Sequence, residues 1–201
     1  MNNSKAVPVF PLSIFILPGG ISRIRVFEAK YLRLVTIAMK QRGFIIVDKD
    51  NTVDINHKEQ WASWVEVINF DQGPEGILEV DVKCKSLVNL TSFYQESDGL
   101  SFATIEPTAN WSQLSPSAGV INASSLKMLS QSLWNVFKSN SLLNELYIDK
   151  QLDNACWVVA RWLELLPIAN ETKKIFVCDD SFEVAKDFVQ SIIHQEKIIL
   201  K

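Results

Sequence analysis

The chain has 201 residues, of which 47% are hydrophobic, including six Trp and eleven Phe, and this composition excludes an intrinsically disordered protein. Its formal net charge of −3, from 20 basic and 23 acidic residues, excludes a protein that binds polyanions by bulk charge. The apolar segment 7–20 is interrupted by Pro8, Pro11 and Pro18, which excludes the unbroken helix of a signal peptide or a membrane span. With three widely spaced cysteines as well, we expect a cytoplasmic protein with reduced thiols and no membrane partner.

The first half of the sequence is typical of β-strands with one helix. Helical spacing of apolar residues over 28–41, ended by Gly43, predicts that helix. Strands are predicted at residues 7–10, 22–27, 44–47, 64–70, 77–91 and 100–105. Alternation is clearest in the 77–91 strand, whose predicted buried face carries Leu78, Val80, Val82, Cys84, Val88 and Leu90.

The second half is typical of a helical bundle. Residues 111–123 contain Ser, Pro and Gln and are predicted to be a linker. Helical stripes follow, and helices are predicted at residues 126–137, 153–166, 170–177 and from 180 onward. We therefore expect an α+β protein, with a β-rich subdomain at residues 1–110 and a helical subdomain at residues 124–201.

The sequence carries no recognisable catalytic or metal-binding motif. His57 and His194 have no neighbouring ligand at metal spacing, and no nucleophile elbow or phosphate-binding loop is present. Cys178 is followed by two acids, and neighbouring acids do not favour a nucleophilic thiolate. We expect no catalytic residue, metal or cofactor.

Two groups of residues require an interpretation from the sequence. Arg25 and Glu28 flank the junction between a predicted strand and the predicted helix, and we interpret them as a structural ion pair. Trp61 and Trp64 lie at the start of another strand, where one of them could be an exposed aromatic anchor, although core packing is the favoured interpretation.

The order and spacing of several short motifs resemble the Lon N-terminal domain family. The resemblance begins with V-P-V-F-P-L at residues 7–12, continues with L-P-G-G at residues 17–20, and then includes R-V-F-E-A-K-Y at residues 25–31. It extends through G-F-I-I at 43–46 and W-V-E-V at 64–67 to Trp157, Arg161, Leu163, Leu166 and Pro167, and then Lys173 and Lys174. It covers nearly the whole chain, from Val7 to His194.

This resemblance implies a PUA-like β-rich barrel or sheet followed by a helical bundle. It further implies a non-catalytic, substrate-recognising domain without the ATPase and peptidase modules of Lon protease. The expected partners are unfolded or tagged polypeptide segments, or a protease or chaperone. The expected contacts are Leu17, Pro18 and Ile21, at a tip that we expect to stay exposed, together with Trp61 and Trp64; Arg25, Glu28 and Tyr31 are expected to form the structural junction.

The sequence departs from the family pattern at three places, where Cys84 and Leu87 occupy the slots of a Gly and an Arg and Lys30 replaces an Arg. Two alternatives remain open. PUA-like folds include RNA-binding modules, although the negative charge and sparse basic–aromatic interleaving disfavour this function here. A small enzyme whose site is assembled only in three dimensions is the other alternative.

Overall fold

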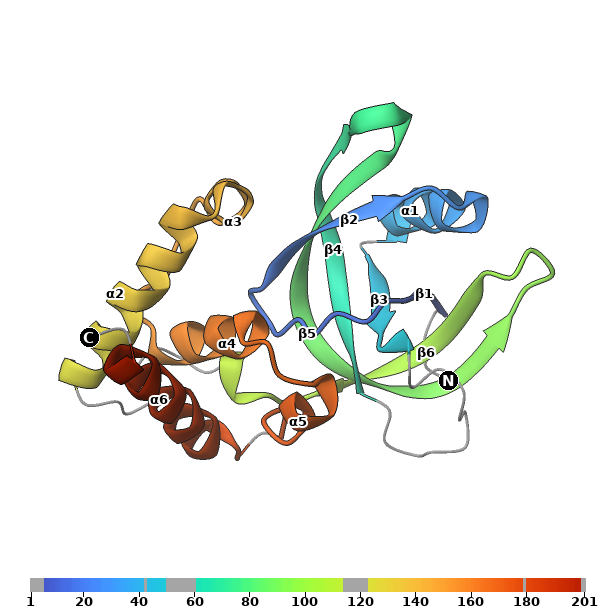
Figure 1. The fold of residues 1–201 in the computed structure, drawn as a ribbon. Coiled ribbons are helices and arrows are strands. Elements are labelled where there is room, and N and C mark those ends of the chain that lie inside the picture. Colours follow the sequence, from blue (N-terminus) through green and yellow to red (C-terminus); the bar gives the residue numbers. More distant parts are fainter. Residues whose placement is uncertain (1–5, 42, 50–60, 114–122, 179, 200–201) are drawn as a thin grey trace. The chain divides into compact units, whose positions relative to one another are not determined.

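The computed structural model describes residues 6–41, 43–49, 61–113, 123–178 and 180–199 (Figure 1). The chain forms two compact units, Met1–Thr108 and Ala109–Lys201. Among the described residues, the first unit contains one six-stranded sheet, one α-helix and a 3₁₀ turn at Pro74–Gly76, and the second contains helices and no strand. The predicted α+β fold class is therefore confirmed.

The sheet of the first unit closes on itself. Its strand order is β2-β5-β4-β3-β1-β6, and β6 also pairs with β5, so that five strands form a ring and β2 lies beside β5 (Figure 1). All pairings are antiparallel except β1 with β3. The strands and the helix of this unit are β1 (Val7–Pro11), β2 (Ile21–Val26), α1 (Ala29–Gln41), β3 (Phe44–Val47), β4 (Trp61–Gln72), β5 (Leu78–Gln95) and β6 (Ser101–Thr108).

Two apolar clusters lie on opposite faces of this sheet. Neighbouring residues of one strand divide between them, as Val9 and Phe10 of β1 show, because successive side chains of a strand point to opposite sides. One cluster takes in the buried face of α1, including Leu34, and the other is built from strand residues such as Ile45. The sheet is thus apolar on both faces where the ring forms.

The predicted buried face of β5 is only partly continuous. Val80, Val82 and Cys84 pack in the cluster that contains α1, but Val88 packs in the other cluster. A register shift between β4 and β5 lies between these two stretches, and such a shift changes the side to which the following residues point. The prediction of one shared face is therefore wrong beyond Cys84.

The second unit packs its helices around a central apolar one. The side chain of Asn154 accepts a hydrogen bond from the Trp157 N–H at 3.2 Å and caps α4, whose residues Ala155 to Leu163 are all buried. The helices of this unit are α2 (Ala123–Ser139), α3 (Ser141–Leu146), α4 (Ala155–Leu165), α5 (Asn170–Lys174) and α6 (Phe182–Ile199), preceded by a 3₁₀ turn at Trp111–Gln113.

Trp111 is part of this helical core and not of a linker. Its side chain is fully buried, and its indole N–H donates to the backbone carbonyl of Phe176 at 2.8 Å and lies 3.1 Å from the hydroxyl of Ser181. The prediction of a linker is therefore wrong for residues 111–113. Most of the remainder, residues 114–122, lies outside the described residues.

An ion-pair network joins α1 to the turn between β5 and β6. The guanidinium of Arg33 lies 2.6 Å from the carboxylate of Glu96 and 2.7 Å from that of Asp98. The backbone N–H of Leu100 donates to Asp98 Oδ1 at 3.0 Å. This hydrogen bond is the largest influence on the pKa of Asp98 and, together with Arg33, lowers it below its ordinary value despite the opposing effect of desolvation.

The Asp98 contribution to stability should therefore depend on pH. A carboxyl whose pKa falls on folding stabilises the folded state above its unfolded pKa of about 3.9, and this stabilisation is lost as the pH falls through the folded pKa. We expect Asp98→Ala to lower the urea midpoint at neutral pH and to lower it less and less below about pH 4. Urea denaturation of both proteins across this pH range measures the difference between their midpoints. A difference that stays constant down to about pH 2 would contradict the coupling of Asp98 protonation to stability.

Candidate functional site

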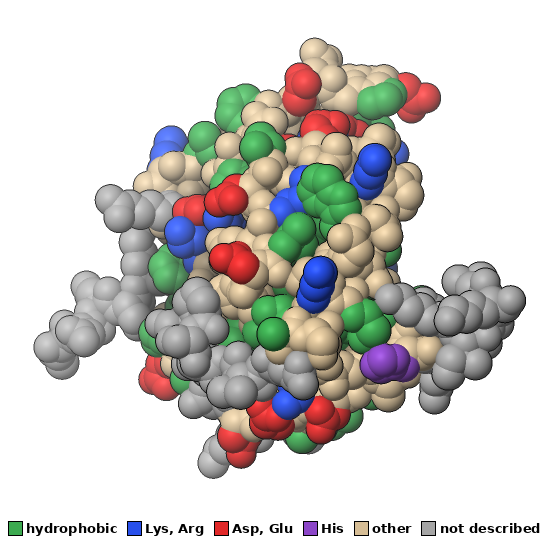
Figure 2. Space-filling model, turned by 90° about the vertical axis from the view of Figure 1, so that its left-hand side faces the viewer, with side chains coloured by type: hydrophobic (Ala, Val, Ile, Leu, Met, Phe, Trp, Pro, Cys, Tyr) green, Lys and Arg blue, Asp and Glu red, His purple; other side chains and the backbone are tan. Residues whose placement is uncertain are grey.

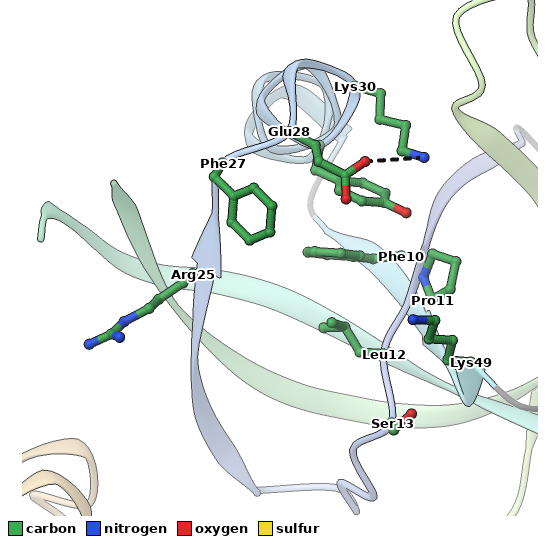
Figure 3. A pocket seen from close by; sticks show the side chains of 10 residues that line it. Phe10, Pro11, Leu12, Ser13, Arg25, Phe27, Glu28, Lys30 and Lys49 are labelled. Carbon is green, nitrogen blue, oxygen red and sulfur yellow. Dashed lines mark ion pairs between the residues drawn. The ribbon is translucent and has the colours of Figure 1, made fainter. Parts of the chain in front are cut away.

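A pocket of about 460 Å³ opens where the ends of β1 and β2 meet the start of α1 (Figure 3). The end of β1 and the residues after it supply one wall, and the β2–α1 junction supplies the other. The lining residues are Phe10, Pro11, Leu12, Ser13, Arg25, Phe27, Glu28, Lys30, Tyr31 and Lys49. We call this site the Phe10–Phe27 pocket.

The pocket has an aromatic interior beside an exposed aromatic side chain. The rings of Phe10 and Tyr31 stack with centroids 4.1 Å apart, and Phe10 is only 4% exposed. Phe27 is 72% exposed, and Figure 3 shows its ring on the side of the pocket that faces Phe10. A large apolar side chain in water beside an apolar cavity is a feature typical of a binding surface.

Lys30 and Glu28 form an ion pair at the pocket. Its ammonium lies 3.3 Å from the Glu28 carboxylate and 4.8 Å from the centre of the Tyr31 ring. Burial lowers the pKa of Lys30, but Tyr31 and the hydrogen bond and charge of Glu28 together outweigh it and raise the pKa above its ordinary value. Lys30 therefore carries its positive charge at neutral pH, next to an apolar cavity.

Arg25 does not pair with Glu28, so that prediction is wrong. The guanidinium of Arg25 contacts Glu79 Oε1 at 3.0 Å, and in Figure 3 the side chain points away from the pocket. Arg25 and Glu79 are direct cross-strand partners of β2 and β5, whereas Glu28 lies beyond the end of β2. Because of this strand pairing, Arg25 contacts Glu79, which is far away in the sequence, and not Glu28, which is close in the sequence.

The tip formed by the residues after β1 is less exposed than expected. Leu17 and Pro18 are buried and Ile21 is half-buried, so the prediction of an exposed patch is wrong for the first two. The physical reason is backbone pairing with β5, since Gly19 N–H donates to the Cys84 carbonyl and Cys84 N–H donates to the Gly20 carbonyl. This pairing holds the turn against the sheet.

Trp61 and Trp64 are both partly buried at the start of β4. The Trp61 ring meets Phe15 edge to face with centroids 5.6 Å apart, and Trp64 packs against the apolar cluster that contains Val9. Neither lines the Phe10–Phe27 pocket. Contacts with neighbouring apolar residues cover part of both side chains. Their role as ligand contacts stays a prediction.

Sequence reasoning interpreted Arg25, Glu28 and Tyr31 as structural and assigned no binding role to Phe10 or Phe27. The structure brings all five to one pocket. A signal for Phe27 was present, because an aromatic residue between the end of a strand and the acidic start of a helix lies where the chain leaves the core. Phe10 gave no such signal, since an apolar residue within a short strand is expected to be core.

The pocket combines apolar walls with polar and charged side chains. Its apolar lining consists of Phe10, Pro11, Leu12 and Phe27. The other lining residues are polar or charged: Ser13, Arg25, Glu28, Lys30, Tyr31 and Lys49. Within the described ranges, no group of three or more His, Cys, Asp and Glu side chains is placed to hold a metal ion. The pocket fits an apolar or aromatic group of a ligand.

The surface charge does not form a basic tract on the face drawn in Figure 2. Lys and Arg side chains lie there among Asp and Glu side chains, with hydrophobic side chains between them. Binding of nucleic acids without bulk charge would need a concentrated basic groove. The described residues of this face show no such groove in Figure 2.

A mixed strand-and-helix domain with an aromatic-walled pocket at a strand-to-helix junction has the kind of cavity that recognition domains present to ligands. A family model described as the ATP-dependent protease La (LON) substrate-binding domain matches residues 6–174. The chain belongs to this family, whose domain is non-catalytic. The predicted resemblance is confirmed.

Solved structures agree with this fold. The crystal structure of a Lon N-terminal domain protein from Xanthomonas campestris has 23% identity and a TM-score of 0.59, with 92% of this chain and 97% of that chain covered. The N-terminal domain of a Mycobacterium avium complex Lon protease has 9% identity and a TM-score of 0.64, with 94% and 98% covered. No curated protein matches the sequence significantly. Among the described helices, none has the length and hydropathy needed to cross a bilayer.

Proposed function

We propose that this protein binds exposed apolar segments of unfolded polypeptides without catalysis, and that the Phe10–Phe27 pocket is the contact site. The observation that carries the proposal is Phe27, which is 72% exposed beside the cavity formed by the Phe10–Tyr31 stack. A ligand side chain that covers this ring removes apolar surface from water, which is the dominant favourable term in association. Membership of a substrate-binding family supports a role in recognition.

The geometry favours weak and reversible capture. Full burial of one Phe side chain stabilises a complex by about 1.5–3 kcal/mol, which corresponds to about 10- to 150-fold in affinity. One pocket therefore recognises a short apolar stretch of any unfolded chain. A segment marked for degradation, or an exposed apolar segment of a protease or chaperone partner, presents the same chemistry to the site.

Ile21, Trp61 and Trp64 are proposed as secondary contacts because each keeps part of its side chain in water. We also propose a cytoplasmic location. Its support is that Cys84, Cys156 and Cys178 are all free thiols, as is usual in a reducing compartment.

Phe27→Asp should weaken capture of an unfolded protein by about tenfold or more, because a carboxylate next to the cavity must lose its hydration when a ligand enters. The probe is fluorescently labelled lactalbumin that has been reduced and carboxymethylated so that it cannot refold. Its affinity is measured by fluorescence anisotropy. Phe27→Leu should retain most of the binding, because the apolar contact survives.

Ile148→Asp provides the matched control, since Ile148 is 92% exposed and lies in the helical unit. This substitution should leave the affinity unchanged. Equal affinities of Phe27→Asp and the unsubstituted protein, with unchanged circular dichroism, would remove the pocket from the proposal. A loss of affinity equal in both Asp variants would show that their added charge, and not the pocket, controls capture.

A further inference from the structure

The outer edge of β4 lacks a strand partner over its second half. β3 pairs with β4 only at Ser63, Trp64 and Val65, whereas β5 accompanies β4 as far as Gln72. Within the described part of the chain, residues 66–72 thus have β5 on one side and no strand on the other. The far end of this hairpin extends past β2 in Figure 1.

This open edge is accessible and carries apolar side chains. The last five residues of β4, from Ile68 to Gln72, are all exposed. Ile68 is 45% exposed and Phe70 is 58% exposed. An uncovered strand edge presents backbone N–H and C=O groups to which another extended chain can add by hydrogen bonding. The edge therefore combines a backbone template with apolar anchor points.

The acidic side chains of the β4–β5 hairpin indicate which kind of peptide this edge can bind. The segment 66–81 contains five acids, Glu66, Asp71, Glu75, Glu79 and Asp81, and no Lys or Arg. Three of them have cationic partners outside the segment, because Arg23 and Arg25 contact Asp81 and Glu79, and Lys85 contacts Glu66.

Two acids next to the open edge remain uncompensated. Asp71 and Glu75 make no ion pair with any described residue, and the Asp71 carboxylate accepts only the backbone N–H of Gln72. A second copy of this chain would bring the same acids edge to edge, where like charges repel. A basic segment gains attraction at the same positions.

We propose that the open edge of β4 binds a short extended peptide segment in which Lys or Arg alternates with apolar residues. The segment adds as a strand alongside residues 68–72, with apolar side chains near Phe70 and basic ones near Asp71 and Glu75. The register shift between Val67 and Asn69 disturbs the ladder there and limits the added strand to a few residues. This surface shares no residue with the Phe10–Phe27 pocket and does not depend on its function.

The test uses a fluorescein-labelled heptapeptide of alternating Lys and Val with blocked ends, and measures its binding to the full chain by fluorescence anisotropy. We expect saturable binding that weakens as salt is added. The double variant Asp71→Lys with Glu75→Lys should bind this peptide at least about tenfold more weakly, because two attractions become repulsions. A heptapeptide of alternating Glu and Val should bind the double variant better than it binds the unsubstituted protein.

A second peptide tests strand addition itself. N-methylation of alternate residues along one edge of the Lys-Val peptide removes the hydrogen-bond donors of that edge and keeps its charge. If a strand is added, methylation of one of the two edges abolishes binding. Equal binding of the plain peptide and both methylated peptides would overturn strand addition.

Two control variants test whether peptide binding depends on the open edge of β4, and not on charge elsewhere or on the Phe10–Phe27 pocket. Asp149→Lys with Asp153→Lys makes the same charge change at exposed positions of the helical unit and should leave peptide binding unchanged. Phe27→Asp should also leave it unchanged, so failure of the pocket and failure of the edge are distinguishable.

Two results would overturn the proposal. One is unchanged peptide affinity in the Asp71 and Glu75 double variant. The other is a concentration-dependent dimer in analytical ultracentrifugation that Phe70→Lys dissociates, which would assign the edge to a second copy.

Discussion

Trp111→Ala should lower the free energy of unfolding of the helical unit by about 3–5 kcal/mol, the range for removal of a buried large aromatic side chain. Trp111 is fully buried, and its ring lies 5.4 Å from that of Phe182, centroid to centroid. Its indole N–H also satisfies the carbonyl of Phe176 at 2.8 Å. The substitution therefore leaves a cavity and removes the hydrogen bond from a buried acceptor.

Urea denaturation followed by circular dichroism at the helical band measures this change in the unit that contains Trp111. Trp111→Phe should cost less than Trp111→Ala, because the ring fills most of the space and only the N–H is lost. Trp134→Ala is the matched control, since Trp134 is 40% exposed and contacts Lys150 through its ring. Its effect should stay within about 1 kcal/mol. A loss for Trp111→Ala no larger than this control would contradict its role as a core anchor.

Trp111 also shows where local patterns lose their predictive power. The Ser-, Pro- and Gln-rich stretch after it predicts a linker, and composition over a window cannot reveal that one aromatic residue at its start is buried against Phe176 and Phe182. By contrast, the helical spacing over 28–41 and the alternation over 77–91 were sufficient to place α1 and the first part of β5. Periodicity identifies an element, but the partner of each side chain depends on contacts far apart in sequence.

At the candidate site too, local sequence patterns revealed the element boundaries but not the contacts between residues far apart in sequence. Arg25, Glu28 and Tyr31 were recognisable from the sequence as a strand-to-helix junction, and the structure places all three at the pocket. That Phe10 stacks on Tyr31 requires β1 to lie beside α1, which follows only from the order of strands in the sheet. Likewise, the closure of the sheet depends on β6 pairing with both β1 and β5, which no local pattern specifies.

Glu164→Leu should destabilise the helical unit by about 3–5 kcal/mol, because it removes a carboxylate that is paired with a buried guanidinium. The Arg161 side chain is 1% exposed, and its Nε and Nη2 contact the two carboxylate oxygens of Glu164 at 2.7 and 2.8 Å. The Trp157 ring lies 5.5 Å from the same guanidinium. The substitution removes this carboxylate, which offsets part of the cost of desolvating the Arg161 guanidinium.

The double variant Arg161→Leu with Glu164→Leu separates charge from packing. Replacement of a whole buried ion pair by apolar side chains is often neutral, whereas removal of one partner is costly. The double variant should therefore be more stable than Glu164→Leu alone, as measured by urea denaturation of both proteins and of Arg161→Leu. If the two single effects simply add, the carboxylate and the guanidinium are not coupled, and the loss in Glu164→Leu comes from packing alone.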